Sequence, residues 1–376
     1  MRKEQRVEIC VIGGGIFGLS AAYHVAKAGN EVLVVERGGI GREASGAHAG
    51  SVALQNKPLK MLPFMMQALK KWEGLSEELG FDVGYERRGG FRIASGEEDV
   101  IALETLLPEQ RAAGVPLEFL EGQTLRKEAP YLKDIVVAAN YCHLDGLANP
   151  FKTVFAYAKA IERYGGKIIR HTPVTHISSE GHDVLIHTPN KTIIAKKVIN
   201  AAGVWAGSVA LMMGVSLPIA GTALMCSITE TGRKVFPHMV THAMGNLTLK
   251  QIDGRILIGG AWRGDGDPYT GKKKVNLSNF KGSISWACEA IPEMQRFKIL
   301  RSWIGFSAQT PDRLFLMGQL PPYNGRFYVM AGGASGFSLA PVTGKIMAEW
   351  VLSDSVPDNA GLFDTKRFFK NSMESL

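Results

Sequence analysis

Alternation of apolar runs and glycine-rich turns marks the first forty residues. Val7 to Ile12 is an apolar, β-branched run of strand type, and the segment from Ile16 to about Lys27 has helical character. Gly29 is a plausible helix stop, and a second apolar run from Glu31 to Val35 ends on an acid, Glu36. The pattern predicts a strand, a helix and a second strand, joined by tight turns.

The turn between the first strand and the helix carries the spacing G-x-G-x-x-G. Gly13 permits the sharp turn, Gly15 lets a pyrophosphate approach the backbone, and Gly18 lets the helix pack on the sheet, with Ile16 and Phe17 between them. The positive end of the helix then faces the phosphates. Glu36, which Arg37 follows, is placed to accept hydrogen bonds from ribose hydroxyls and disfavours a 2′-phosphate, hence NADP. The motif predicts a dinucleotide and leaves NAD and FAD open.

A long loop of small residues follows the acid. It runs from Gly38 to Ser51, and such a loop suits a backbone wrapped around an extended ligand better than a free surface loop. Its candidate cofactor-binding residues are Ala44, Ser45, His48, Ala49, Gly50 and Ser51.

The rest of the chain alternates helices and strands. Leu59 to Leu79 has apolar residues at helical spacing and Gly80 as its stop. We further expect a hairpin over Tyr85 to Ala94, a helix over Glu97 to Gly114 interrupted near Pro108, and a turn at Asp145-Gly146. Strands are expected at Ala138 to Cys142, at Ile168 to Ile177 with Val174, at Thr192 to Asn200, repeatedly between Leu217 and Gly260, and at Arg326 to Ala331.

Two of these strands run into small-residue turns. Asn200 is followed by a turn with Ala202, Gly203 and Trp205, which is again an arrangement that faces a nucleotide. The last strand leads into a glycine-rich segment before a closing helix. Its candidate residues are Gly333, Ser335, Gly336, Phe337 and Ser338.

Composition excludes several classes of protein. The 376 residues carry a net charge of +8, but the basic residues, such as the pair Lys57 and Lys60, are scattered and lack a nucleic-acid motif. We interpret them as solvated faces, with a docking surface for an acidic protein or an anionic membrane as the alternative. No apolar run reaches ~18 residues and no signal peptide is evident, so we expect a cytoplasmic protein.

Metal chemistry within the chain is not expected. The four cysteines are far apart without C-x-x-C, which argues against zinc and iron–sulfur sites. His238 and His242 lie in a strand-like segment without a nearby acid. The segment from Gly266 to Lys273 imitates a phosphate-binding loop but has a lysine where magnesium needs a hydroxyl, so we expect an exposed basic loop.

Four blocks together resemble one family. They are Val11 to Gly18 with Glu36-Arg37, Ala44 to Gly50, Asn200 to Ala206, and Trp303-x-Gly305 with Thr310-Pro311-Asp312 followed by Gly332-Gly333-x-Ser335-Gly336. In order and spacing they are similar to the D-amino-acid oxidase-like FAD-dependent amine oxidoreductases. The resemblance implies FAD, with the isoalloxazine near residues 45–51 and 333–338 and the adenine against the backbone of Val174. It also implies oxidation of a C–N bond by hydride transfer to flavin N5, followed by hydrolysis of the imine.

The order of the segments predicts the architecture, because the strands near the N-terminus, the middle and the C-terminus face a nucleotide and the intervening ones are antiparallel. We expect an α/β fold in which a Rossmann-like FAD-binding domain, 1–83, 146–215 and 300–376, is interleaved with a substrate domain. The latter, 84–145 and 216–299, is an α+β unit on a mostly antiparallel sheet. His48, Gln55 and His242 are the candidate catalytic residues.

Two departures from the family bear on the substrate. Many members carry an arginine three residues before the Thr of the T-P-D block to clamp a carboxylate, and this chain has Ser307 there, with Arg301 and Arg313 nearby in sequence only. Phe337 stands where the family often has histidine. These features, together with the sequence from Ala49 to Gln55, resemble catalytic subunits of the opine dehydrogenase and hydrogen cyanide synthase type. Such subunits work with separate iron–sulfur or further flavin subunits.

We therefore expect a dehydrogenase of a secondary amine or imino acid in a heteromeric complex. An oxygen-using oxidase of the glycine or sarcosine oxidase type is the alternative, and a subunit that only relays electrons is a third interpretation.

Overall fold

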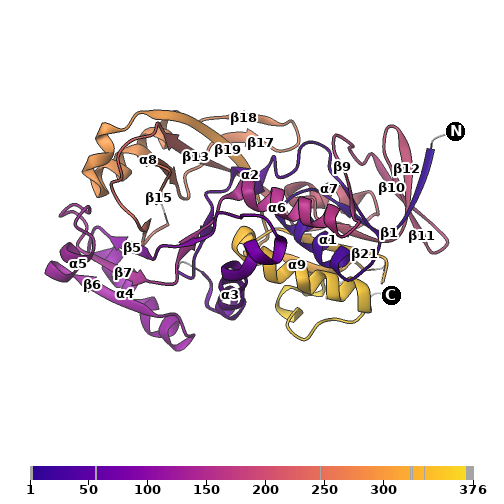
Figure 1. Cartoon of the computed structure of the whole chain (residues 1–376), viewed down its shortest axis with the longest axis horizontal. Coiled ribbons are helices and arrows are strands. Elements are labelled where there is room, and N and C mark those ends of the chain that lie inside the picture. The colour runs from indigo at the N-terminus through magenta and orange to yellow at the C-terminus, as the bar shows by residue number, and fades with distance from the viewer. Residues whose placement is uncertain are drawn as a thin grey trace.

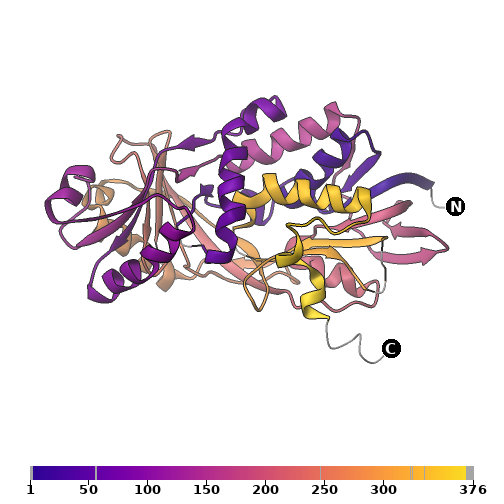
Figure 2. The ribbon, with the colours of Figure 1, turned by 90° about the horizontal axis from the view of Figure 1, so that it is seen from below.

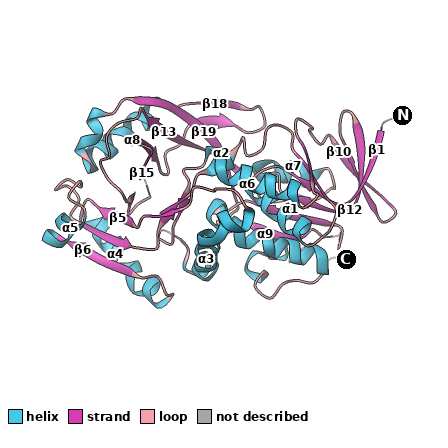
Figure 3. Ribbon diagram, viewed as in Figure 1, coloured by secondary structure: helices cyan, strands magenta, loops and turns pink. Residues whose placement is uncertain are grey.

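The computed structural model describes residues 3–55, 57–245, 247–321, 323, 325–333 and 335–369. Two large sheets lie at opposite ends of an elongated molecule, with helices between and around them (Figures 1 and 3). This mixed α/β arrangement is the predicted fold class.

The first sheet has a parallel core. β1 (Lys3–Ile12) pairs in parallel with β2 (Val32–Val35) and β12 (Lys191–Asn200), and β2 pairs in parallel with β9 (Lys167–Ile169). β21 (Phe327–Ala331) extends the parallel core beside β12, while β10 (His176–Glu180), β11 (Asp183–His187) and β20 (Leu316–Gln319) are antiparallel additions. The central strands are apolar on both faces because both faces are covered.

Four helices lie on one side of this sheet. They are α1 (Ile16–Lys27), α3 (Leu62–Leu79), α6 (Pro150–Arg163) and α9 (Gly336–Ser353), whose buried residues form one core with Ile9, Val11 and Val34 (Figure 2). Three of them, α1, α6 and α9, lie against the strands of the sheet, and α3 lies against α9 and α6. Cys10 and Ile12 point to the opposite face, where α7 (Ala206–Leu211) packs. Short helical segments complete the chain: α2 (Ala44–Ala47) and the 3₁₀ turns Leu59–Met61, Gly203–Trp205, Pro292–Arg296, Gly361–Phe363 and Thr365–Phe368.

The second sheet is mostly antiparallel. Its strands lie in the order β19 (Ile299–Gln309), β13 (Ala220–Thr229), β16 (Arg255–Gly259), β15 (Thr248–Ile252), β14 (Met239–His242), β5 (Gly90–Ala94), β7 (Ala138–Cys142) and β6 (Leu117–Glu121). Phe91, Val240, Leu249 and Ile256 point to one face and pack with α8 (Leu277–Ala290). The helices α4 (Glu97–Ala112) and α5 (Gly122–Glu128) lie at the β5–β7–β6 end (Figure 1).

Two small sheets complete the fold. β3 (Ser51–Val52), β8 (Gly146–Leu147) and β4 (Glu86–Arg87) form a three-stranded sheet that joins the two ends of the molecule. β17 (Asp265–Asp267) and β18 (Lys272–Lys274) form an exposed hairpin. The segment from Gly266 to Lys273, whose sequence imitates a phosphate-binding loop, lies in this hairpin. It is the exposed basic loop that the sequence predicts.

Several local expectations were wrong. Tyr85 to Ala94 is not a hairpin, because β4 pairs with β8 while β5 pairs with β7 and β14. Pro108 does not interrupt α4, which continues through it from Glu97 to Ala112. The strand expected around Val174 is broken by a loop between β9 and β10.

The predicted domain division stays a proposal. One of its boundaries needs adjustment, because β19 begins at Ile299 and pairs along its length with β13. The strand therefore belongs to the second sheet rather than to the dinucleotide-binding part.

Candidate functional site

Backbone crowding explains two glycines of the motif. Gly13 has a φ of +114°, and a Cβ there would lie 2.5 Å from the carbonyl oxygen of Ala201. A Cβ on Gly18 would lie 2.1 Å from the carbonyl oxygen of Gly13. Only glycine allows β1, the turn and α1 to meet this closely beside the end of β12.

The start of α1 faces the small-residue loop and Glu36. Gly15 is the N-cap and provides no side-chain cap, while the N–H of Ile16 donates to Ser45 Oγ at 2.9 Å. Glu36 accepts hydrogen bonds from the N–H groups of Gly14 and Gly38, both at 2.7 Å. The acid at the end of β2 thus fixes the glycine turn and remains beside the helix N-terminus, where a dinucleotide's phosphates and ribose are expected.

The predicted adenine end gathers residues from three segments. The guanidinium of Arg37 lies 3.4 Å from the ring centre of Trp205. The N–H of Thr172 donates to the carbonyl oxygen of Glu36 at 2.9 Å, which brings the loop with the partly buried Val174 toward this corner. Trp205 lies in the turn with Ala202 and Gly203 after β12, so the structure brings these predicted residues together.

His48 belongs to the loop expected at the isoalloxazine, residues 45–51, which we call the flavin loop. Its Nδ1 accepts the N–H of Gly50 at 2.9 Å, and its ring stacks on Phe337 with the centroids 4.8 Å apart. Burial, with the positive charges of Lys250 and Lys57, lowers the pKa of His48 to about 3. The imidazole is therefore neutral near pH 7 with its proton on Nε2, which suits a hydrogen-bond donor better than a base.

The glycine-rich segment before α9 is bound to the same loop. Ser338 Oγ donates to the carbonyl oxygen of Ser51 at 2.8 Å, and Trp72 Nε1 donates to the carbonyl oxygen of Ser338 at 2.7 Å. Gly333 has a φ of +73°, and Ser335 has a φ of +71°. A Cβ on Gly336 would lie 2.9 Å from the ring of Phe17, which joins this segment to α1; residue 334 lies outside the described residues.

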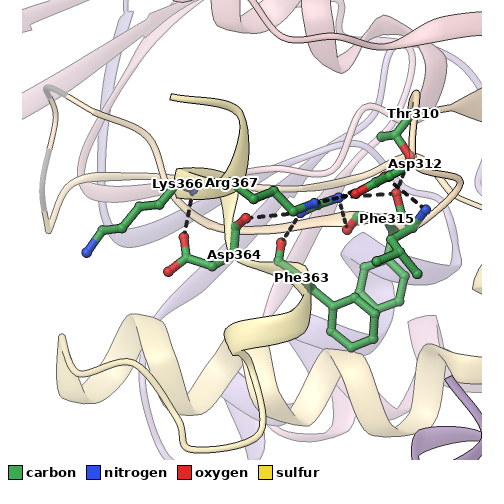
Figure 4. Close-up of polar contacts among 8 residues, drawn as sticks. Thr310, Asp312, Phe315, Phe363, Asp364, Lys366 and Arg367 are labelled. Atoms are coloured by element: carbon green, nitrogen blue, oxygen red, sulfur yellow. Dashed lines mark hydrogen bonds and ion pairs between the residues drawn. The ribbon is translucent and has the colours of Figure 1, made fainter. Parts of the chain in front are cut away.

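The T-P-D block is part of a structural clamp (Figure 4). Arg367, near the C-terminal end of the described chain, donates to Asp312 at 2.7 Å and to the carbonyl oxygens of Phe363 and Phe315 at 2.7 and 3.0 Å. The rings of Phe315 and Phe363 stack with centroids 3.9 Å apart. Because a Cβ on Gly333 would lie 2.4 Å from the backbone nitrogen of Phe315, the clamped block supports the glycine-rich segment directly.

One face of the second sheet packs on the flavin loop. Trp303 Nε1 donates to the carbonyl oxygen of Ala47 at 3.0 Å, and a Cβ on Gly305 would lie 2.6 Å from Cβ of Ala47. Lys250, on β15, donates from Nζ to the carbonyl oxygen of Ala49 at 2.5 Å and to Ser51 Oγ at 2.6 Å. The side chain of Lys250 is 0% exposed, and burial lowers its pKa to about 7.

A second buried polar group surrounds Gln55. Its Nε2 donates to the carbonyl oxygen of Gly90 at 3.0 Å and to Asp145 Oδ2 at 3.1 Å. Asp145 also accepts the N–H of Leu54 at 2.7 Å, and burial raises its pKa to about 6. Lys57 lies within electrostatic range of Asp145. The sequence suggested only a turn at Asp145 and a solvated Lys57, so both were missed.

His242 lies elsewhere. It is buried at the end of β14, with its ring edge-on to Trp286 of α8 at 4.4 Å and its Nε2 3.1 Å from Asp99 of α4. The alternation along β14 directs it to the same side as Val240, away from the flavin loop. Of the three candidate catalytic residues, His48 lies in the flavin loop and Gln55 follows that loop closely in the chain. His242 lies on the other face of the second sheet, away from both.

No arginine stands at the position where many family members clamp the substrate carboxylate. Ser307 on β19 accepts a hydrogen bond from Gln309 at 3.0 Å. Arg301 and Arg313 are both exposed, so neither replaces a buried arginine at that position. Among the described residues, no group of three or more His, Cys, Asp or Glu side chains is arranged to hold a metal.

Comparison with known proteins identifies the family. The family model described as FAD dependent oxidoreductase (DAO) matches residues 8–350. The chain belongs to this family. Its cofactor is accordingly FAD, and the residues present fit it: a helix N-terminus without a side-chain cap, glycines that keep the turn open, and an acid at the end of β2.

Relatives of this flavoenzyme cover nearly its whole length. Glycine oxidase of Bacillus subtilis (strain 168) is 27% identical over 366 residues, covering 94% of this chain and 95% of that protein. One subunit of the opine oxidase of Rhizobium meliloti is 26% identical, covering 96% of this chain and 98% of that subunit. The solved structure of L-proline dehydrogenase from P. horikoshii has a TM-score of 0.89 and 27% identity, covering 98% of this chain and 99% of that one.

The sequence predicts that no helix spans a membrane. In the parts of the chain that the structure describes, no helix is both long and apolar enough to cross a membrane.

Proposed function

We propose that this flavoenzyme is a dehydrogenase that oxidises the C–N bond of a secondary amine or imino acid, of opine or proline type. It acts as the catalytic subunit of a heteromeric complex. Full-length similarity to an opine oxidase subunit and to L-proline dehydrogenase supports the substrate class. Similarity to a protein named as a subunit supports the complex, and the second sheet supplies the substrate-facing side chains.

The observation that carries the proposal is the sheet face against the flavin loop. There Ser307 stands where many amino-acid oxidising members carry an arginine, and the buried cation is instead Lys250, in contact with Ala49 and Ser51. A site built this way is not the monocarboxylate clamp of a simple amino-acid oxidase. It suits a larger substrate whose anionic part lies over β15.

FAD, when bound, supplies the hydride acceptor at N5 for the hydrogen on the carbon beside the amine nitrogen. The chain's own residues hold and shield that reaction. Neutral His48 carries its proton on Nε2 as a hydrogen-bond donor, and its stack on Phe337 excludes water from one side. Gln55 orients the loop through Gly90 and Asp145.

Anaerobic titration of the purified yellow protein tests the proposal. Opines, cyclic imino acids, sarcosine, glycine and D-amino acids are added separately while the visible flavin absorption is followed. We expect bleaching by an opine or a cyclic imino acid, with slow recovery in air. Bleaching by none of these amines overturns the proposal.

An oxygen-using oxidase of the glycine oxidase type is the second candidate. Its support is the similarity to glycine oxidase of Bacillus subtilis and to the glycine oxidase structure from Geobacillus kaustophilus, with a TM-score of 0.88 and 25% identity. Bleaching by glycine with recovery in air within seconds selects this candidate.

A further inference from the structure

Two buried basic side chains lie on the same face of the second sheet. Arg92 of β5 pairs with Thr241 of β14, Thr241 pairs with Thr248 of β15, and Lys250 lies two residues after Thr248. Paired residues, and residues two apart on a strand, project to the same face. Arg92 and Lys250 are 5% and 0% exposed, so both are held away from bulk water.

A third basic side chain reaches this group from the segment between β3 and the 3₁₀ turn Leu59–Met61. Lys57 is partly buried, and its positive charge acts on Lys250, on His48 and on Arg92. We call Lys57, Arg92 and Lys250 the cationic cluster. They come from a loop and two strands, so only the folded chain assembles them.

The charge of the cationic cluster is not balanced by protein. Among the residues that the structure describes, none of the three forms an ion pair. Asp145 is the carboxylate that acts on Lys57. With Lys250 protonated, three cations and one acid leave an excess of two positive charges, and buried charge is costly unless a ligand supplies a partner for it. Because burial lowers the pKa of Lys250 to about 7, a bound anion also favours the protonated form of this lysine.

Hydrogen-bonding capacity is also unfilled. Arg92 donates to the carbonyl oxygen of Ala243 at 2.5 Å, but its Nε is buried without a partner among the described residues. Lys250 uses two of its three N–H donors on Ala49 and Ser51. Donors and charge together describe a site for an anion.

We propose that the cationic cluster binds the carboxylates of the substrate, and that this substrate is a secondary amine with two carboxylates. The inference rests on the proposed function and names its substrate class. A monocarboxylate such as glycine leaves one of the two excess charges unpaired, whereas a dicarboxylate pairs both. The cluster takes the place of the arginine that Ser307 replaces.

Binding of unreactive carboxylates to the oxidised holoenzyme tests this without turnover. Glutarate, butyrate and the neutral glutaramide are titrated while perturbation of the flavin's visible spectrum reports the Kd. We expect glutarate to bind about tenfold tighter than butyrate, since one more charge pair forms, and glutaramide to cause no perturbation. Equal binding of glutaramide and glutarate overturns the proposal.

Three lysine variants locate the effect. Lys57→Met and Lys250→Met are each expected to weaken glutarate binding about tenfold or more, while Lys274→Met, on the exposed strand β18, leaves it unchanged. Lys57 is partly exposed, and its variant therefore remains informative if Lys250→Met does not fold. Unchanged glutarate affinity in Lys57→Met overturns the proposal.

The pH profile separates ligand binding from a merely structural role of Lys250. The groups that act on its charge are His48, Lys57 and Cys226, and the pKa values of His48 and Cys226, about 3 and about 11, exclude their titration between pH 6 and 9. We expect glutarate affinity to fall as the pH rises above 7 in the wild type and in Lys57→Met. In Lys250→Met the fall should be smaller, because only Lys57, whose pKa burial also lowers, and Asp145 still titrate near the site. Identical profiles in all three proteins contradict the inference.

The two proposals fail in different ways. If glutarate binds with the expected charge dependence but no amine bleaches the flavin, the anion site stands and the proposed function fails. If amines bleach the flavin equally with and without carboxylates, and glutarate does not bind, only the present inference fails.

Discussion

Replacement of Lys250 by methionine should make the protein more stable and less able to bind an anion. Burial lowers the pKa of Lys250 from 10.5 to about 7, and a fall of about 3.5 corresponds to ~5 kcal/mol of unfavourable free energy for the charged form. Methionine removes this cost but also the hydrogen bonds to Ala49 and Ser51, together worth ~3 kcal/mol when the buried carbonyl is left unpaired. The balance predicts a variant more stable by ~2 kcal/mol at pH 6.

The sign of the pH dependence follows from proton binding. Between pH 7 and 10.5 the unfolded chain keeps the Lys250 proton while the folded chain loses it, so the stability of the wild type rises with pH in this window. Below pH 7 both states are protonated and the full cost is present. The advantage of Lys250→Met should therefore be largest at pH 6 and should disappear by about pH 9.

Denaturant unfolding at pH 6, 7.5 and 9, in excess FAD, measures this. Tryptophan fluorescence follows unfolding, and Lys274→Met serves as the exposed control with no expected change. A Lys250→Met protein that is less stable than the wild type at every pH, or whose difference from it does not vary with pH, refutes the reasoning.

Three further substitutions test the cofactor site and its support. Glu36→Gln replaces one oxygen that accepts a backbone N–H, and should weaken FAD binding about 30-fold in a flavin-release titration; unchanged affinity contradicts this role. Arg367→Ala should lower the free energy of unfolding by ~3 kcal/mol, against less than ~0.5 for Lys366→Ala, whose side chain lies outside the clamp; equal losses rule the clamp out (Figure 4). Gly333 and Gly325 both have a positive φ, but only in Gly333→Ala would the new Cβ lie 2.4 Å from a backbone nitrogen. Gly333→Ala alone should therefore lose FAD on gel filtration, and equal FAD retention in the two variants refutes this.

The β-α-β unit that carries the glycine motif is readable in the sequence because it is local. Gly13, Gly18 and Glu36 lie within one contiguous β-α-β unit, so their spacing alone fixes how they meet. The helix over α3 and its glycine stop were confirmed for the same reason, since Gly80 has a φ of +72°. Periodicity and turn chemistry act over a few residues, and they determined these elements.

The anion site is not readable in the same way. Alternation along β15 indicates that Leu249 and Lys250 point to opposite faces, but not that Ala49, far earlier in the chain, covers the lysine. The sequence predicts only a turn at Asp145, because its partners, Leu54 and Gln55, approach it only in the folded chain. A buried ion of this kind depends on long-range pairing that composition does not encode.

Strand pairing failed for a related reason. Tyr85 to Ala94 has the glycines and alternation of a hairpin, yet its two halves join different sheets. Local turn signals identify where a strand ends. The partner of each strand depends instead on which of its two faces is buried against other elements, and this is set only in the folded chain.

The measurement closest to the central claim is a double-mixing stopped-flow experiment. The holoenzyme is first mixed anaerobically with an amine bearing two N-linked carboxylated arms, and the bleached protein is then mixed with air-saturated buffer. The account predicts rapid bleaching followed by slow recovery that an artificial electron acceptor accelerates. Absence of bleaching, or bleaching followed by equally fast recovery with oxygen alone, contradicts it.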